Sequence, residues 1–265
     1  MAYLIERILI KVLKLLKVDL LTHAHVQIGA GHSPDLTGDG EEYVIKYLIE
    51  RILARRPDVL FDVGANSGDY AKILSETFPS SQIYCFEPMP DNFKKLTKQT
   101  AGLNTINILS ALGSHEGTLK LHLGEHNSNG TMATAHKGTL ETIFPFVGKI
   151  DEFESPMTTL DKFCSNTISQ IDFLKIDVEG SELDVLKGAA NLIKSDRIKI
   201  IQFEFNEFNI FSKTFMYDFY ELLKQYRFYR ILPQNKLLPL GEYNSSLEIF
   251  RYQNILALHK SLNYE

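Results

Sequence analysis

The pattern that most constrains this chain is a repeated exchange between short apolar runs and amphipathic stretches, which starts near residue 59 and continues almost to the end. Runs such as VLFDV (59–63) and FLKID (173–177) are apolar at nearly every position. Strands of this kind are buried on both faces. Strand–helix repeats at this spacing imply a parallel sheet with right-handed crossovers. We therefore expect a doubly wound α/β fold, with its ligands beyond the carboxyl ends of the strands.

The same pattern indicates where the individual strands lie and where the regularity stops. Residues 124–153 show no clear period and contain several turn formers, so an irregular insert is expected there. Thr118–Leu123 is a candidate for a short extra strand. The strands of the main sheet are expected at Val59–Gly64, Gln82–Glu87, Ile106–Ala111, Asp172–Asp177, Lys199–Phe205, Phe228–Leu232 and Asn254–His259.

The first 21 residues are rich in Leu, Ile and Val but are interrupted by charges. Arg7, Lys11, Lys14 and Lys17 recur every three or four residues, which predicts an amphipathic helix with a basic stripe. Two roles stay open for this helix: packing on its own domain or on a second subunit, or attachment to an anionic membrane. We expect a helix and linker over residues 1–38 and one main domain over residues 39–265.

Charge and cysteine content narrow the class of protein. The chain has 265 residues and a formal net charge of −5, which argues against a nucleic-acid partner because phosphate binding favours a basic surface. Cys85 and Cys164 stand far apart with no partner motif, as expected for reduced thiols. No uninterrupted apolar centre of a secretory signal is present. A cytoplasmic location is expected, with membrane association through residues 1–21 as a possibility.

The segment FDVGANSGDY (61–70) lies between the first expected strand and its helix. Gly64 and Gly68 allow a tight turn and a close approach to a ligand. The dinucleotide-binding motif G-x-G-x-x-G, counted from Gly64, has glycine at the positions that Asn66 and Asp69 occupy here. The loop therefore favours a nucleoside ligand with an ammonium group over a pyrophosphate. Asp62 would compensate that ammonium.

Acidic residues follow three other expected strands. Glu87, at the end of the second, is placed to accept hydrogen bonds from two ribose hydroxyls. Asp177 and Glu179 lie at the end of the fourth, close to Lys175, and Glu204 lies at the end of the fifth. Acidic side chains at the carboxyl ends of neighbouring strands can orient an acceptor, remove a proton or bind a hard cation. A Mg²⁺ ion held by Asp177, Glu179 and Glu204 is one interpretation; the alternative is a general base, Asp177 or Glu179, with Lys175 or Glu204 orienting the acceptor.

The ordered segments FDVGANSGDY, CFEPMPDNF, ALGSHEGTL, TTLDKF, FLKIDVEGSELDVLKGA and FEF resemble the FkbM family of methyltransferases over roughly residues 39–259. The resemblance implies a class I methyltransferase sheet of seven strands with the last one antiparallel. It also implies S-adenosylmethionine as cofactor and O-methylation of a sugar, glycan or natural-product hydroxyl.

The resemblance also assigns roles to individual residues. Asp177 and Glu179 would face the transferred methyl group, and Glu87 would hold the ribose. The methionine-binding loop would contain Asp62, Gly64, Asn66 and Gly68. Ala111 and Leu112 would lie beside the adenine, and Glu41, at the start of the domain, would reach the cofactor pocket.

Two alternatives remain open at the level of sequence. A nicotinamide-dependent oxidoreductase shares this fold class, although the second and third glycines of its fingerprint are missing. A nucleotide-binding scaffold without catalysis would keep the pocket alone. Asn206-Glu207-Phe208-Asn209 also departs from the charged or His-containing turn expected after the fifth strand, so the identity of the acceptor is not fixed.

Overall fold

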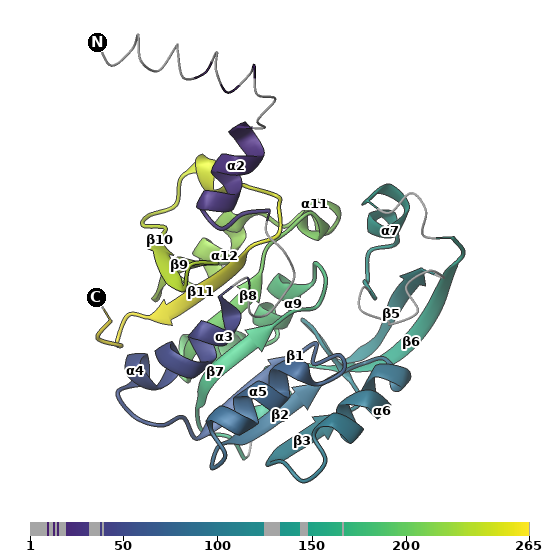
Figure 1. Ribbon diagram of the computed structural model, residues 1–265. Coiled ribbons are helices and arrows are strands. Elements are labelled where there is room, and N and C mark those ends of the chain that lie inside the picture. Colours follow the sequence, from purple (N-terminus) through teal and green to yellow (C-terminus); the bar gives the residue numbers. More distant parts are fainter. Residues whose placement is uncertain are drawn as a thin grey trace.

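The computed structural model describes residues 10, 13, 15, 20–31, 38, 40–124, 133–143, 148–165 and 167–264 (Figure 1). Most of the predicted N-terminal helix, residues 1–21, lies outside this range, so its expected roles at a membrane or in a dimer stay predictions. Asp39, the first residue of the expected main domain, also lies outside it. No described helix has both the length and the apolar character needed to cross a membrane.

The centre of the molecule is a sheet of eight strands in the order β10-β9-β11-β8-β7-β1-β2-β3. The five strands from β8 to β3 are parallel, and β11, the last strand in the chain, is antiparallel to β8 and β9. The bounds are β1 Val59–Val63, β2 Gln82–Phe86, β3 Thr105–Ile108, β7 Ile171–Ile176, β8 Ile198–Glu204, β9 Tyr226–Leu232, β10 Lys236–Pro239 and β11 Asn254–His259. The doubly wound fold with its antiparallel last strand is thereby confirmed.

The edge strand β10 is the addition to the seven expected strands. It pairs antiparallel with β9 alone, and its Leu237 packs against the core that contains Phe173. Its short run KLLP ends in a proline, which sheets tolerate at their edges. A four-residue edge strand leaves too weak a pattern to be recognised from sequence.

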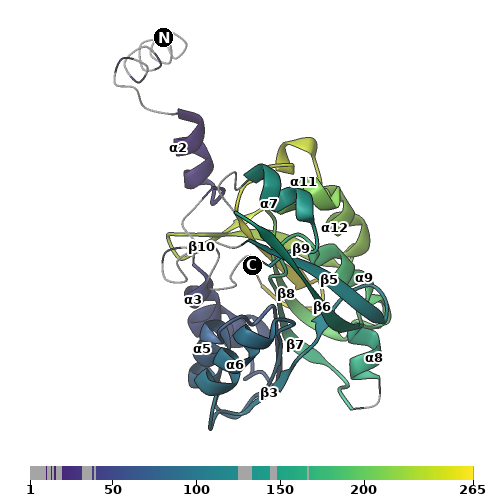
Figure 2. The ribbon, with the colours of Figure 1, turned by 90° about the vertical axis from the view of Figure 1, so that its right-hand side faces the viewer.

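Helices cover both faces of this sheet, as the side view shows, with α3, α5 and α6 on one face and α8, α9 and α12 on the other (Figure 2). Each face has its own apolar core, one around Phe173 and Leu74, the other around Phe203 and Leu186. The helices are α2 Leu20–Gln27, α3 Glu41–Tyr43, the π-helix η1 Val44–Leu48, α4 Ile49–Leu53, α5 Asp69–Thr77, α6 Pro90–Gln99, α7 Lys137–Ile143, α8 Leu160–Cys164, α9 Glu182–Lys187, α10 Ala190–Lys194, α11 Phe208–Ser212, α12 Met216–Leu222 and the 3-10 helix η2 Ser245–Leu247.

A second, three-stranded sheet projects beside the carboxyl edge of the main sheet (Figure 1). It consists of β4 Ala111–Leu112, β6 Ile150–Thr158 and β5 Gly117–Gly124. Part of the predicted irregular insert, residues 124–153, is therefore regular: it contains α7 and the start of β6. The expectation was wrong there because β6 is stabilised by pairing with β5, including an ion pair of 3.0 Å between Lys120 and Glu152, which no local pattern reveals.

Two further boundaries differ from expectation, and one helical segment is interrupted at a glycine. Helix α2 occupies part of the predicted linker, and Gly29 at φ 73° follows its end. The strand expected over Ile106–Ala111 is two strands in two sheets, β3 and β4. After β7, helices α9 and α10 are separated at Gly188, where a Cβ would lie 2.0 Å from the carbonyl oxygen of Gly113.

Candidate active site

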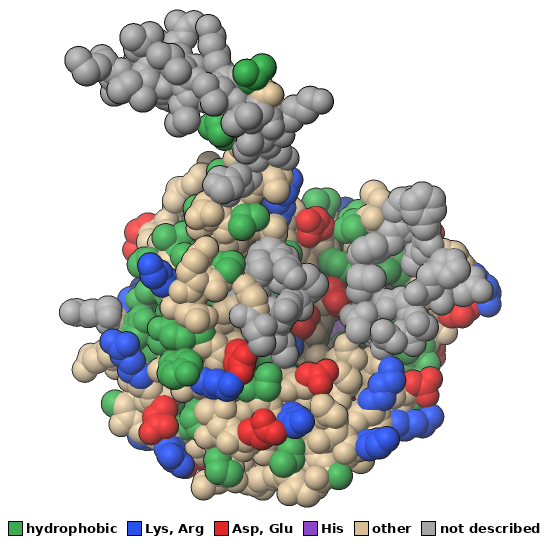
Figure 3. Space-filling view, viewed as in Figure 1, with side chains coloured by type: hydrophobic (Ala, Val, Ile, Leu, Met, Phe, Trp, Pro, Cys, Tyr) green, Lys and Arg blue, Asp and Glu red, His purple; other side chains and the backbone are tan. Residues whose placement is uncertain are grey.

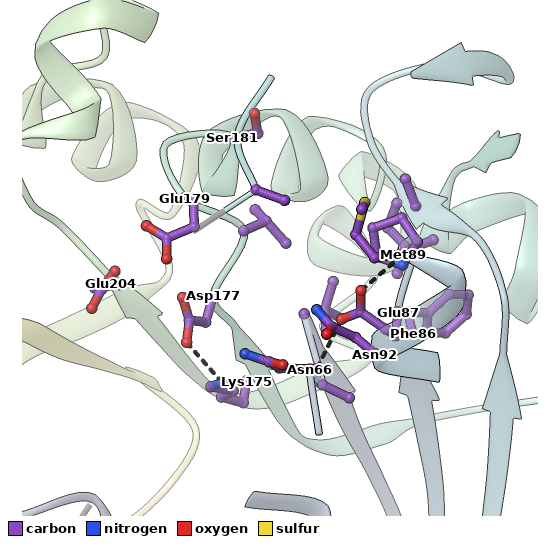
Figure 4. A pocket seen from close by; sticks show the side chains of 18 of the residues that line it. Asn66, Phe86, Glu87, Met89, Asn92, Lys175, Asp177, Glu179, Ser181 and Glu204 are labelled. Carbon is purple, nitrogen blue, oxygen red and sulfur yellow. Dashed lines mark hydrogen bonds and ion pairs between the residues drawn. The ribbon is translucent and has the colours of Figure 1, made fainter. Parts of the chain in front are cut away.

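A cavity of about 590 Å³ lies at the carboxyl ends of β1, β2, β7 and β8. The space-filling view shows a recess on this face with acidic side chains inside it (Figure 3). The close-up shows two ends: Glu87 and Met89 on one side, Asp177, Glu179 and Glu204 on the other (Figure 4). All the expected site residues line the cavity except Asp62 and Gly68.

Gly64 forms the turn between β1 and α5. Its φ is 84°, and a Cβ there would lie 1.7 Å from the carbonyl oxygen of Asp177. The turn is held on both sides, because Gly64 N donates to Phe86 O at 2.9 Å and Asp177 N donates to Val63 O at 2.9 Å. Only glycine allows the loop to lie this close to the end of β7.

Glu87 is the buried acid at the end of β2. One carboxylate oxygen accepts a hydrogen bond of 2.8 Å from Asn66 N, and the other accepts one of 2.8 Å from Met89 N. Burial raises the pKa of Glu87 to about 7, although these two hydrogen bonds oppose the rise. Each oxygen has a second lone pair, so the carboxyl group can still accept hydrogen bonds from a ligand in the cavity.

The structure does not place Gly68 on the cavity wall. It precedes the first residue of α5 at φ 94°, and a Cβ there would meet Leu96 Cδ1 at 2.9 Å. Its role is therefore to start the helix against α6. The expectation that Gly68 belongs to the methionine-binding loop stays a prediction.

Asp62 is also absent from the cavity wall. It is fully buried within β1, and its partner in register on β7 is Lys175, whose Nζ lies 3.7 Å from Oδ1. Burial raises the pKa of Asp62, and the nearby Lys175 opposes the rise. The cation beside Asp62 in the structure is Lys175, and the expected contact between Asp62 and a ligand ammonium stays a prediction.

Lys175 is enclosed between two aspartates and a ring. Its Nζ lies 3.0 Å from Asp177 Oδ2 and 4.9 Å from the centre of the Tyr70 ring. Burial alone would lower the Lys175 pKa, but Asp177, Asp62 and Glu41 together raise it. The Lys175 ammonium is thus neutralised by carboxylates of the same chain.

Three carboxyl groups meet at the other end of the cavity. Glu204 ends β8 and is 8% exposed; its Oε2 accepts a hydrogen bond of 2.7 Å from Asn206 Nδ2. Glu179 lies in the turn after β7 at φ 54°. Burial, followed by the charge of Asp177, raises the pKa of both Glu179 and Glu204 well above the usual range of a glutamate. The described residues contain no group of three or more His, Cys, Asp or Glu side chains arranged to hold a metal ion, so the expected Mg²⁺ ligand set is not formed.

Sequence reasoning missed several residues that shape this end. Glu182 Oε1 accepts hydrogen bonds of 3.1 Å from Val178 N and Gly180 N, and so fixes the turn that carries Glu179. Burial raises the pKa of Glu182 to about 7. Glutamate two residues after glycine in VEGSE is the signal that could have identified this role.

A chain of polar side chains across the sheet was missed as well. Tyr70 OH donates to Gln202 Oε1 at 3.1 Å, and Gln202 Nε2 donates to Glu41 Oε1. Gln202 is the register partner of Lys175 on β8. The three residues come from three distant elements, so no local motif marks them.

The second sheet supplies the facing wall. Leu119 and Leu121 of β5 line the cavity with Ala133 and Ala135. Thr134 Oγ1 donates a hydrogen bond of 2.8 Å to the carbonyl oxygen of Glu179, which ties this wall to the acidic end. Apolar side chains opposite the carboxyl groups exclude water from the space between.

A doubly wound sheet of this strand order, with a glycine turn after β1 and a buried acid after β2, defines a class I methyltransferase-like domain. The family model described as the methyltransferase FkbM domain matches residues 62–230, well over half of the chain. The chain belongs to the FkbM methyltransferase family, as the sequence resemblance predicted.

Among characterised relatives, the chain is similar to the hexuronic acid methyltransferase AglP of Haloferax volcanii, with 33% identity over 165 residues that make up 62% of each chain. It is also 26% identical to the 2-O-methyltransferase NoeI of Sinorhizobium fredii, over 55% of this chain and 63% of that protein. The chain therefore spans less than two thirds of the length of either relative.

Solved structures show only distant likeness. A methyltransferase FkbM from Methylobacillus flagellatus KT gives a TM-score of 0.45 at 13% identity, over 82% of this chain and 47% of that one. The plantazolicin methyltransferase BpumL in complex with SAH gives 0.45 at 10% identity, over 83% and 82%. Likeness at this level carries no information about individual site residues.

Proposed function

We propose that this protein is an S-adenosylmethionine-dependent O-methyltransferase that acts on a hydroxyl group of a sugar, glycan or natural product. The observation that carries the proposal is the two-ended cavity: a glycine turn and Glu87 at one end, and the carboxyl groups of Asp177, Glu179 and Glu204 at the other. A single space of about 590 Å³ joins a nucleoside-type binding end to a place where an acceptor can lie.

The residues at the first end suit S-adenosylmethionine. Glu87 is 4% exposed, lines the cavity and retains lone pairs for ribose hydroxyls. Gly64 and Asn66 would hold the methionine part, Glu41 would close the pocket from α3, and Ala111 and Leu112 would lie beside the adenine. The bound cofactor supplies an electrophilic methyl group on a sulfonium; the rest of the chemistry depends on the protein's own side chains.

At the second end the protein must hold a hydroxyl and take its proton. A hydroxyl is a poor nucleophile at neutral pH, so a base has to accept the proton as the oxygen attacks. Asp177 and Glu179 both line the cavity and are the two candidates. Lys175 would act through Asp177, to which it is bound at 3.0 Å, and Glu204 would orient the acceptor.

The substrate class is supported by the relatives. AglP is named for hexuronic acid, a sugar derivative, and NoeI for transfer to a 2-hydroxyl oxygen. Both names describe methylation of a particular acceptor position, which agrees with an acceptor end rich in hydrogen-bonding groups.

Calorimetric titration with S-adenosylmethionine, S-adenosylhomocysteine and NAD tests the proposal. We expect micromolar binding of the first two, weakened at least about tenfold in Glu87→Gln because a bond to a buried charged group is lost. Glu76→Gln, on the exposed side of α5, is the matched control and should bind as the wild type does. Tighter binding of NAD, or no binding of either nucleoside, would contradict the proposal.

A further inference from the structure

The charges around the cavity are strongly unequal. Among the described residues, Lys175 is the one basic side chain on the wall, whereas carboxyl groups reach it from α3, α5, β8 and the turns after β2, β7 and β8. The internal residues outside the described part of the chain, 32–37, 39, 125–132, 144–147 and 166, contain no Lys or Arg, whereas the N-terminal ones do. The cavity therefore has little positive charge to offer a ligand.

The single ammonium is already neutralised. Lys175 lies 3.0 Å from Asp177 and 3.7 Å from Asp62, and its side chain is 8% exposed. A negatively charged acceptor would have to displace an aspartate to reach it. The carboxylates of Asp62 and Asp177 beside Lys175 would repel such a ligand.

The carboxyl groups of Glu179 and Glu204, by contrast, are left for a ligand. Glu204 is more than nine-tenths buried, and among the described residues its Oε1 has no hydrogen-bond partner, because Asn206 binds Oε2. The carboxyl group of Glu179 has no partner within the described part of the chain. Both line the cavity.

A group with positive charge and several N–H donors would satisfy both glutamates. Burial raises the pKa of Glu179 and Glu204 above the usual range of a glutamate, and a bound cation stabilises the charged form of both carboxyl groups. An ammonium supplies three donors and one positive charge. A neutral hydroxyl supplies one donor, and a carboxylate supplies none.

We propose that the acceptor carries a protonated amine, as an amino sugar or an amino-bearing natural product does, and that Glu179 and Glu204 bind this amine beside the hydroxyl that is methylated. The inference rests on the proposed function and names its substrate class. It sets this chain apart from AglP, whose name specifies a hexuronic acid.

Three probes that differ at one position test the proposal: the methyl glycosides of glucosamine, glucose and glucuronic acid. Each is titrated at pH 7 into the full chain saturated with S-adenosylhomocysteine, while the carboxyl signals of ¹³C-labelled glutamate are followed by NMR. We expect the glucosaminide to bind at least about tenfold more tightly than the glucoside, as charge-assisted hydrogen bonds require, and the glucuronide to bind most weakly. Equal affinities, the reverse order or no detectable glucosaminide binding would overturn the proposal.

Variants assign the preference to the two glutamates. In Glu179→Gln and Glu204→Gln, separately and together, the ratio of glucosaminide affinity to glucoside affinity should fall at least about tenfold. Glu116→Gln, an exposed glutamate outside the cavity, is the control. Retention of the preference in the double variant would also overturn the proposal.

The same samples separate this inference from the proposed function. Saturation by S-adenosylhomocysteine is measured first, and its absence would contradict the proposed function alone. Normal saturation combined with a wrong probe order would contradict the amine proposal and leave the methyltransferase assignment standing.

Discussion

The two ends of the cavity differ in how completely the protein satisfies its own polar groups. At the glycine-turn end, both oxygens of Glu87 accept backbone N–H groups, and the turn itself is bound to β2 and β7. At the acidic end, the carboxyl group of Glu179 and one oxygen of Glu204 have no partner among the described residues. The difference indicates that the first end is built in advance for an invariant ligand, whereas the second is completed by a ligand with donors of its own.

The largest expected effect comes from breaking the preformed end. Gly64→Ala would place a Cβ 1.7 Å from the carbonyl oxygen of Asp177 and should lower the free energy of unfolding by about 4 kcal/mol or more. Urea denaturation measures this. Gly102→Ala is the control: it also has a positive φ, 82°, but no atom lies within 4 Å of the added Cβ. It should cost about 1 kcal/mol. Equal losses would show that strain, and not the close approach, dominates.

The next effect concerns the ion pair beneath the acidic end. Lys175→Met leaves Asp62 buried without its cation, which should lower the free energy of unfolding by about 3 kcal/mol. The double variant Asp62→Asn/Lys175→Met should recover most of that loss. Lys187→Met, which removes an exposed lysine 3.1 Å from Asp184, should change stability by less than about 0.5 kcal/mol. No recovery in the double variant would show that Asp62 is not the reason.

Both ends contribute to the dependence of stability on pH. The pKa values of Glu87 and Glu182 are about 7, above the usual range, so the folded chain keeps protons that the unfolded chain loses at lower pH. Their stabilising contribution is complete below about pH 4.5 and falls as the pH rises towards 7. The slope is about 1.4 kcal/mol per pH unit for each group.

Thermal unfolding between pH 4.5 and 8 measures this slope. Glu182→Gln should remove one group's share of it, whereas the exposed Glu116→Gln should leave it unchanged. A slope that is identical in Glu182→Gln and the wild type would show that Glu182 does not carry the proton.

The smallest effects compare one glutamate from each end directly. In Glu87→Gln an NH2 group replaces one of the two carboxylate oxygens, so either Asn66 N or Met89 N loses its acceptor. This loss should lower the free energy of unfolding by about 1–2 kcal/mol. Glu204→Gln keeps an oxygen for Asn206 and removes a like charge, so its effect should stay within about 0.5 kcal/mol. Equal costs would remove the contrast between the two ends.

The glycine-turn end was predictable from sequence, and the reason is local. A glycine after an apolar strand and an acid after the next strand are read along the chain, and parallel strands bring their carboxyl ends together. Gly64 and Glu87 therefore lie where the pattern placed them. The parallel core follows from the same periodicity, whereas the antiparallel β11 was implied by the family resemblance.

The remaining features depend on pairing across the chain. The sequence shows how far Asp62 lies from Gly64 along the chain, which led to its assignment to the ligand. It does not show that Lys175 is the register partner of Asp62. The strand β6 pairs with β5 across residues that show no period of their own. Gln202 joins Tyr70 and Glu41 from separate elements. Such contacts are set by tertiary packing, which single-sequence patterns do not encode.

The most direct test of the account is the calorimetric affinity for S-adenosylmethionine in Glu87→Gln and Glu204→Gln, measured side by side with the wild type. Glu87 belongs to the preformed end and Glu204 to the end completed by the acceptor. The account predicts a loss of at least about tenfold in Glu87→Gln and a change of less than about threefold in Glu204→Gln. A larger loss in Glu204→Gln than in Glu87→Gln would contradict it.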